Sequence, residues 1–246
     1  MIKEKTILIT GSSKGIGFGL AKHYFSKGYR VIINSNNLHN LKTASKKLNN
    51  CAFYKCNLTN EGKVKNMFLK LKKKYKKIDF LICNYGNSNF KNNDLDLKFA
   101  LENNFFTTFN TIKYALPILK SKISKIVCIS SICGVEDIEG APMGYSIAKS
   151  SLNTYVKLIS KKLAKKGIMI NNIAPGNILF NGSIWEKKMK KNKNFIKKYI
   201  KTNVPVNSFG KVSDIALVCD ALINSNNFFT TGQTFVLDGG QTKGFY

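Results

Sequence analysis

Short apolar runs alternate with longer amphipathic stretches along the whole chain. The runs predict strands over residues 6–10, 30–34, 52–56, 80–84, 125–130, 168–175 and 233–238. The stretches between them repeat apolar residues at helical spacing and predict helices over residues 16–26, 38–48, 64–75, 97–119, 145–165 and 214–223. Continuous apolar strands that alternate with helices are buried on both faces, and their crossovers are right-handed. The pattern therefore predicts an α/β fold with a doubly wound parallel sheet of about seven strands.

The length of 246 residues suits one domain over residues 1–246. No apolar run approaches the length that spans a membrane, and the start "MIKEKTILIT" has too short an apolar run for a signal peptide. We therefore expect a soluble, cytoplasmic protein that does not enter a membrane. The six cysteines form no C-x-x-C pair and favour reduced thiols, and His23 and His39 offer no spacing for a metal site.

The formal net charge of +27 raises the question of a polyanionic partner. Lysine supplies nearly all of the charge, and Arg30 is the only arginine, although arginine is the usual reader of guanine edges. Lysines are spread over most predicted helices. We expect no specific nucleic acid; a solvated lysine-rich surface and an acidic partner or substrate both remain open.

The segment "ITGSSKGIGFGLA" joins the first predicted strand to the first predicted helix, with glycines at 11, 15 and 17. Gly11 allows a sharp exit from the strand, Gly15 allows close approach of a pyrophosphate, and Gly17 allows the helix to pack closely on the strand. Backbone N–H groups and the helix dipole then favour the negative charge. The loop predicts a dinucleotide site, in which we include Ser13, Lys14 and Ile16.

The region after the second strand indicates which dinucleotide is bound. An NAD site places an acidic residue there to bind the ribose 2′-hydroxyl. Here no acidic residue occurs between Glu4 and Glu61, and the region reads "VIINSNNLHN". Lys14 is placed to face a 2′-phosphate, and Ser35 and Asn36 can donate hydrogen bonds. We therefore expect NADP(H) rather than NAD(H).

Seven motifs in order carry a resemblance to a known family. They are "TGSSKGIG", "CNYG" at 83–86, Asn104 in "LENNFF", "ISS" ending at Ser131, Tyr145 with Lys149, "IAPG" ending at Gly176, and "TTGQTFVLDGG". With these motifs the chain resembles the short-chain dehydrogenase/reductases of the compact, single-domain type, which have a Rossmann-like fold. It is similar in particular to the 3-oxoacyl-[acyl-carrier-protein] reductases.

The resemblance implies the catalytic residues. Tyr145 is then the general acid in reduction of a carbonyl, and Lys149, one helical turn further on, lowers the pKa of its phenol. Ser131 holds the substrate carbonyl, with Ser130 as the alternative. Asn104 bends its helix and holds a water in a proton relay to Lys149, with Asn103 as the alternative. A lysine four residues after a tyrosine is expected about 1.6 times by chance in so lysine-rich a chain, so this pair alone proves nothing.

The resemblance also implies residues that bind the cofactor: Asn57, Leu58, Asn84, Gly86, Tyr145, Lys149, Pro175, Gly176 and Ile178. Three positions depart from the family pattern. Phe180 stands where the family often has a threonine, for which Asn181 or Ser183 are the possible substitutes. Tyr85 replaces an alanine, and Asn57 replaces an aspartate.

The substrate is the least determined part of the site. Residues 177–205 correspond to the family's substrate lid, and Trp185 there is the only tryptophan. An apolar pocket with a lysine rim suits a small-molecule or carrier-bound carbonyl substrate such as a 3-oxoacyl thioester. The resemblance places Lys122 and Lys166 near the residues that contact the carrier protein. Sugar or polyol ketones are an alternative, and so is a catalytically weak nucleotide-binding module. The family also implies a homotetramer.

Overall fold

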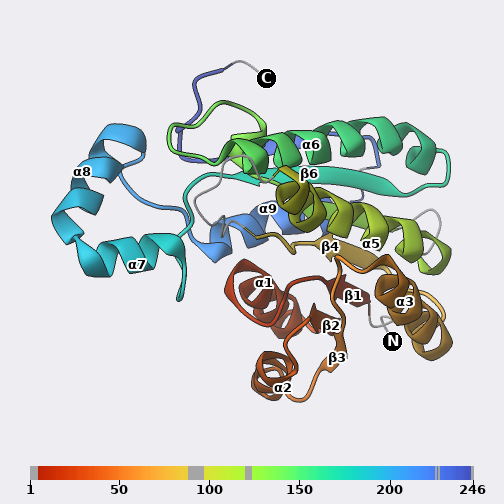
Figure 1. Cartoon of the computed structure of the whole chain (residues 1–246). Helices are drawn as coiled ribbons and strands as arrows, with labels where there is room; N and C mark the ends of the chain where they lie inside the picture. Colours follow the sequence, from red (N-terminus) through yellow and green to blue (C-terminus); the bar gives the residue numbers. More distant parts are fainter. Residues whose placement is uncertain (1–4, 88–96, 120–123, 225, 227, 245–246) are drawn as a thin grey trace.

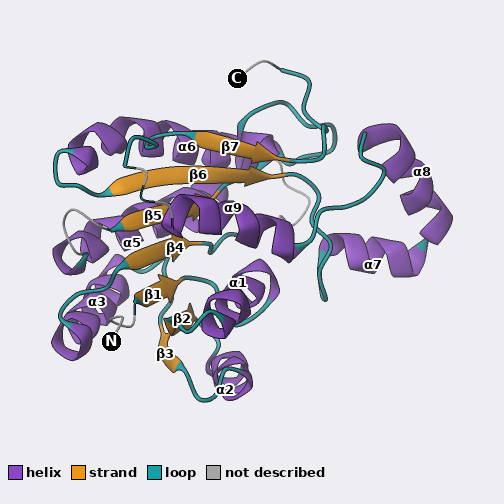
Figure 2. Ribbon diagram, turned by 180° about the vertical axis from the view of Figure 1, so that it is seen from behind, coloured by secondary structure: helices purple, strands orange, loops and turns teal. Residues whose placement is uncertain are grey.

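The computed structural model describes residues 5–87, 97–119, 124–224, 226 and 228–244. The described residues form one parallel sheet of seven strands in the order β3-β2-β1-β4-β5-β6-β7. The strands are β1 (Thr6–Ile9), β2 (Arg30–Ser35), β3 (Ala52–Lys55), β4 (Phe80–Cys83), β5 (Lys125–Ile129), β6 (Met169–Pro175) and β7 (Thr234–Leu237). The predicted doubly wound parallel sheet is confirmed (Figures 1 and 2).

Helices cover both faces of the sheet (Figure 1). One face packs against α1 (Gly15–Ser26), α2 (Leu38–Lys47) and α9 (Val212–Asn224). The other packs against α3 (Glu61–Tyr75), α5 (Thr107–Ala115) and α6 (Met143–Ala164). The six cysteines are free thiols, four of them buried. No helix in the described part of the chain has the length and apolar character needed to cross a membrane.

The helix predicted as continuous over residues 97–119 is interrupted, so that prediction is wrong. It consists of α4 (Leu97–Leu101), a π-helical turn at Glu102–Phe106, α5 and a 3₁₀ turn at Leu116–Ile118. In the π turn, Asn104 Nδ2 donates to the Ala100 carbonyl at 3.2 Å, and Thr107 Oγ1 donates to the Asn103 carbonyl at 3.0 Å. Side chains that bond to carbonyls of the preceding turn disturb the regular ladder, and such π turns often mark functional sites.

The sheet order places a candidate ligand crevice. The chain crosses from β1 outward to β2 and β3, and then returns to the other side of β1 as β4. At such a switch point the connections after two neighbouring strands diverge, which opens a crevice beyond their carboxyl ends. The segments that follow β1, β4 and β5 therefore meet there.

Residues 177–205 form two helices that extend away from the sheet in both views (Figures 1 and 2). They are α7 (Ile184–Lys191) and α8 (Lys193–Asn203). Ser183 Oγ accepts from the Glu186 N–H at 3.0 Å, and the Glu186 carboxylate accepts from the Gly182 N–H at 2.7 Å. This resembles a capping box, except that the glutamate bonds to the residue before the N-cap rather than to the N-cap itself. A small apolar cluster of Ile196, Val204 and Phe209, with Trp185 packed against it, holds the two helices together.

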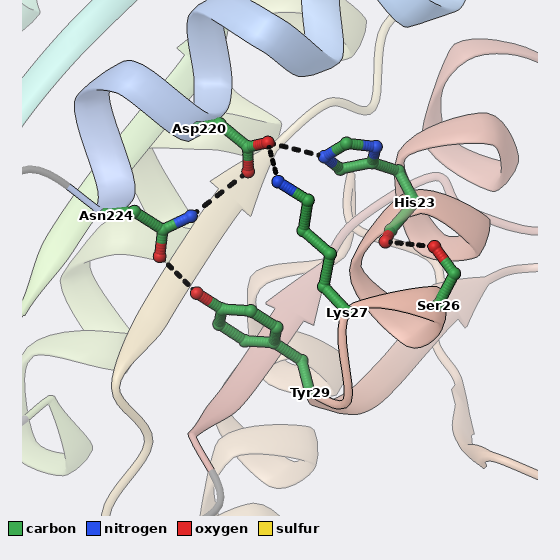
Figure 3. A network of polar contacts seen from close by, with 6 residues as sticks. All are labelled: His23, Ser26, Lys27, Tyr29, Asp220 and Asn224. Atoms are coloured by element: carbon green, nitrogen blue, oxygen red, sulfur yellow. Dashed lines mark hydrogen bonds and ion pairs between the residues drawn. The ribbon is translucent and has the colours of Figure 1, made fainter.

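A polar network joins α1 to α9 on the outside of the sheet (Figure 3). Asp220 accepts from Lys27, lies 2.7 Å from His23 Nε2, and accepts from Asn224 Nδ2 at 3.2 Å. Tyr29 in turn donates to Asn224. Burial alone would raise the pKa of Asp220, but the hydrogen bonds from Lys27 and His23 outweigh it, so the pKa lies below its ordinary value.

We expect Asp220→Asn to lower the free energy of unfolding by about 1–2 kcal/mol at neutral pH, because it removes a mostly buried carboxylate that accepts from the charged Lys27. The lowered pKa means that the contribution is full above the ordinary pKa of an unfolded aspartate and is lost as pH falls through the folded value. Urea unfolding at several pH values measures both effects. Glu61→Gln is the control, because that half-exposed carboxylate also accepts from a lysine and a tyrosine and should change stability less than Asp220→Asn does.

Candidate active site

The glycine turn after β1 has the backbone geometry that its glycines allow. Gly11 and Gly15 have φ angles of +60° and +61°, which L-residues with a side chain rarely adopt. A Cβ on Gly11 would lie 2.8 Å from the Tyr85 Cα, and one on Gly17 would lie 2.5 Å from the Gly11 carbonyl oxygen. Larger residues at 11 and 17 would therefore push the turn away from β4 and from the start of α1.

Asn84, just after β4, fixes this turn from the neighbouring strand. Its Nδ2 donates to the carbonyls of Thr10 and Gly11, each at 3.1 Å. The Thr10 hydroxyl in turn accepts from the backbone N–H groups of Asn84 and Tyr85, at 3.0 and 3.2 Å. The predicted residues Gly11, Gly17 and Asn84 are thus brought together at the switch point.

Ser12 is a supporting residue that the sequence analysis missed. Its hydroxyl donates to the Ile9 carbonyl at 2.6 Å and accepts from the Asn34 N–H at 3.0 Å, and its own N–H donates to the Asn34 carbonyl at 2.9 Å. Ser12 is fully buried, whereas Ser13 is half-buried and Lys14 is exposed. The first of the two serines thus ties the turn to β2, and its neighbours remain accessible.

The residues expected to face the adenosine end lie after β2 and β3. Ser35 Oγ accepts from the Asn37 N–H at 3.3 Å, and Asn36 is exposed beside it. Asn57 Oδ1 accepts from the backbone and the hydroxyl of Thr59, at 3.1 and 3.0 Å, so its amide nitrogen is the group left to face a ligand. The Leu58 side chain is buried in the core, and only its backbone is available to a ligand.

Ser131, Tyr145 and Lys149 meet where β5 ends and α6 begins. The Ser131 side chain forms a hydrogen bond with Tyr145 and accepts from the Cys133 N–H at 3.2 Å. Lys149 Nζ lies 5.7 Å from the centroid of the Tyr145 ring and donates to the Ile129 carbonyl at 2.9 Å. One end of β5 and the first turns of α6 therefore hold a hydroxyl, a phenol and an amine in one group.

Burial controls the protonation of this group. It raises the pKa of Tyr145 well above the ordinary value of a phenol, the Cys133 thiol adds to the rise, and the bond with Ser131 opposes it. Burial also lowers the pKa of Lys149 to about 8. The net shift of the Tyr145 pKa is upward, whereas the sequence analysis expected Lys149 to lower it, and burial is the largest cause of the rise. Tyr145 is thus a protonated phenol at neutral pH, which is the form a general acid requires.

The two serines at the end of β5 have different partners. Ser130 Oγ donates to Asn153 Oδ1 at 2.7 Å, and Asn153 Nδ2 donates to the Gly134 carbonyl at 2.9 Å. Ser130 is therefore occupied in holding α6 to the turn that follows β5, whereas Ser131 contacts Tyr145. Asn153 is a second supporting residue that the sequence analysis missed.

Asn104 reaches from the π turn toward the same group. Its Oδ1 accepts from the Asn87 N–H and its Nδ2 donates to the Asn87 carbonyl, both at 2.9 Å. A Cβ on Gly86 would lie 2.9 Å from Asn104 Oδ1 and 3.5 Å from Lys149 Nζ, so these three residues converge. Asn103 instead donates to Phe99 at 3.0 Å and accepts from the Tyr85 hydroxyl at 3.1 Å.

The loop after β6 brings Gly176 and Ile178 to the same edge of the sheet, following Pro175 at the end of the strand. Gln241, far away in the sequence, accepts from the Asn177 N–H at 3.0 Å and lies against Gly176. Nothing in the local sequence pattern indicated Gln241.

The Phe180 ring lies on the glycine turn, with one ring carbon 3.0 Å from the place of a Cβ on Gly15. The Ser183 hydroxyl, a possible substitute for the family threonine, caps α7 instead. Phe180 thus takes an apolar place above Gly15.

The family model and the sequence relatives place the chain in one family of reductases. A family model described as Enoyl-(Acyl carrier protein) reductase matches residues 11–242. A 3-oxoacyl-[acyl-carrier-protein] reductase, FabG, of Rickettsia prowazekii (strain Madrid E) is 30% identical over 245 residues, covering 96% of both chains. The structure of ElxO with NADP bound has a TM-score of 0.85 at 29% identity, covering 97% of this chain and 98% of ElxO. L-sorbose reductase from Gluconobacter frateurii, complexed with NADPH and L-sorbose, has a TM-score of 0.88 at 21% identity, covering 99% and 98%, and shows the shared fold alone.

Proposed function

Because the chain belongs to the short-chain dehydrogenase/reductase family and is an oxidoreductase, we propose that it uses NADPH to reduce a ketone to an alcohol. The observation that carries this proposal is the group of Ser131, Tyr145 and Lys149 at the end of β5, beside the glycine turn. A phenol that is protonated, hydrogen-bonded to a hydroxyl and close to an amine is equipped to give a proton to a carbonyl oxygen.

The residues present fit a dinucleotide. At the turn 11–17, Gly11 and Gly17 let the backbone pack closely on its neighbours, and α1 begins there with a half-exposed first turn. The Phe180 ring lies over Gly15 and would have to move aside for a bound pyrophosphate. Such a turn offers N–H groups to a pyrophosphate. Lys14, Ser35 and Asn36 favour NADP(H) over NAD(H), and the ElxO structure contains NADP. When bound, the cofactor supplies the hydride, and the protein orients it.

Each residue of the group has a distinct role. Ser131 donates to the substrate carbonyl oxygen and holds it beside Tyr145, which transfers its proton to that oxygen as the alkoxide forms. Lys149, held by the Ile129 carbonyl, places positive charge beside the phenolate that remains. Asn104 positions the Gly86–Asn87 segment and lies next to Lys149, where it supports the return of a proton.

We infer that the substrate is a carbonyl compound of the 3-oxoacyl thioester class, carried on an acidic or phosphorylated carrier. The similar protein from Rickettsia prowazekii is a 3-oxoacyl-[acyl-carrier-protein] reductase. Lys166 is exposed, and Lys122 lies outside the described residues. The segment 177–205, with Trp185 in its apolar cluster, serves as the substrate lid. A panel of 3-oxoacyl thioesters and of sugar and polyol ketones, followed by the oxidation of NADPH, tests this; turnover of sugar ketones alone would reject the thioester.

Ser131→Ala should lower kcat/KM about 10- to 100-fold, because one hydrogen bond to the reacting oxygen is lost. Ser130→Ala is the matched control and should affect stability more than turnover, since Ser130 bonds to Asn153. Steady-state kinetics and thermal unfolding of both variants separate the two serines. A larger kinetic loss in Ser130→Ala would transfer the role to Ser130.

We also propose a cytoplasmic homotetramer. Aromatic rings of Phe105, Phe109 and Tyr155 stack between the π turn, α5 and α6, and Phe106 and Leu158 expose 44% and 64% of their surface nearby. An exposed apolar face of this kind suits self-association. Sedimentation of the purified protein, compared with Leu158→Asp, tests the assembly.

A further inference from the structure

A groove of about 780 Å³ runs along the outer edge of the sheet, between β3 and α3. Asn36 and Asn57, which follow β2 and β3, line one part of it. The groove therefore begins at the adenosine end of the proposed cofactor site and extends beyond it. Lys55, Lys63 and Lys70, all exposed, also line the groove.

The groove is positively charged and has no acidic residue among its lining residues in the described chain. Glu61, at the first turn of α3, is the nearest acidic residue in the sequence. Its carboxylate accepts from Lys113 Nζ at 2.8 Å and from the Tyr114 hydroxyl at 2.7 Å, so it is held toward α5. The electrostatics of the groove therefore favour an anionic ligand.

Lys55 lies next to the cofactor residues already assigned. In the register of the sheet Lys55 pairs with Ser35, at the carboxyl end of β2. The preceding residue, Asn34, is bonded to Ser12 of the glycine turn through backbone and hydroxyl. The carboxyl ends of β1, β2 and β3 lie side by side. The glycine turn after β1, Ser35 on β2 and Lys55 on β3 are therefore neighbours.

Lys63 approaches from α3. It lines the groove together with Cys56 and Asn57, which follow β3. Lys70 lies about two helical turns further along α3 and away from the end of β2. The groove thus has two lysines near the adenosine end and one further away.

We propose that Lys55 and Lys63 bind the 2′-phosphate of NADP(H) from the β3 side, across the site from Lys14. The inference rests on the proposed function, because it takes the crevice as an NADP(H) site. It assigns two residues outside the glycine turn a part in distinguishing NADP(H) from NAD(H). A phosphate placed between lysines is stabilised by charge-assisted hydrogen bonds that a 2′-hydroxyl does not form.

The test is calorimetric titration of the full chain with 2′,5′-ADP and with 5′-AMP, which needs no turnover. The wild type should prefer 2′,5′-ADP. Lys55→Gln and Lys63→Gln should each weaken 2′,5′-ADP about tenfold and leave 5′-AMP unchanged. Lys70→Gln removes the same charge from the same groove and is the matched control, expected to stay within about twofold. Thermal unfolding of each variant verifies that these exposed substitutions leave the fold intact.

The outcomes separate the two proposals. If the wild type binds both nucleotides equally, the NADP(H) preference itself fails. If the wild type prefers 2′,5′-ADP and Lys14→Gln abolishes the preference while Lys55→Gln and Lys63→Gln keep it, the inference is overturned and the proposed function stands. An equal loss in Lys70→Gln would also overturn it, because the effect would then come from net charge rather than from a phosphate site.

Discussion

Tyr145→Phe should lower kcat about 10²- to 10⁴-fold while NADPH still binds. The substitution removes one oxygen and keeps the ring that packs near Lys149 Nζ. The proton that Tyr145 would give to the alkoxide is then missing, so the loss falls on the chemical step rather than on binding. Stopped-flow measurement of a single turnover separates chemistry from product release.

Two controls make this result specific. Tyr155→Phe removes a hydroxyl from the same helix at a position that packs against Phe105 and Phe109, outside the group, and should change kcat little. Titration of NADPH fluorescence verifies that Tyr145→Phe retains the cofactor. Turnover within about threefold of the wild type would reject the general-acid role of Tyr145.

The strands were predictable from sequence because each is a short apolar run, and β1, β4, β5 and β6 are buried along their whole length. The doubly wound parallel arrangement followed from the alternation with helices and from the handedness of crossovers, whereas the strand order came from the structure. The glycine turn was predictable because glycine adopts the positive φ found at Gly11 and Gly15 more readily than residues with a side chain. In these cases the information lies within a few residues of the feature.

The features that were missed depend on partners far away in the sequence. The π turn arises because Asn104 bonds to Asn87 and Ala100, and periodicity alone reads that stretch as a continuous helix. Gln241 contacts Asn177 across 64 residues of chain. Asn153 in α6, which accepts from the Ser130 hydroxyl, was also missed, because it lies 23 residues further along the chain. Local patterns therefore identified the parts of the site, and tertiary contacts decide how those parts are used.

Lys149→Met should abolish most turnover and at the same time stabilise the fold. Lys149 exposes only 3% of its surface, and burial lowers its pKa to about 8, from an ordinary value of 10.5. A charged lysine there is disfavoured in the folded state, by about 3 kcal/mol for a difference of this size. Methionine keeps most of the buried volume and carries no charge, so it removes that cost. We expect a loss of at least about 100-fold in kcat, because the phenolate is no longer stabilised.

The pH dependence of stability distinguishes the removal of a buried charge from a mere change in side-chain packing. Between about pH 8 and 10.5 the unfolded chain binds more protons at this lysine than the folded chain does, so the wild type gains stability as pH rises through that window. Below about pH 8 both states are protonated, and this slope disappears. Urea unfolding across the window should show the slope in the wild type and not in Lys149→Met, once the titration of the other groups is subtracted as the common background.

Lys157→Met, on the same helix, is the control, and it should retain the wild-type slope. A Lys149→Met variant that keeps the slope would show that Lys149 is not the group that titrates, and the link between its burial and its role beside Tyr145 would be lost.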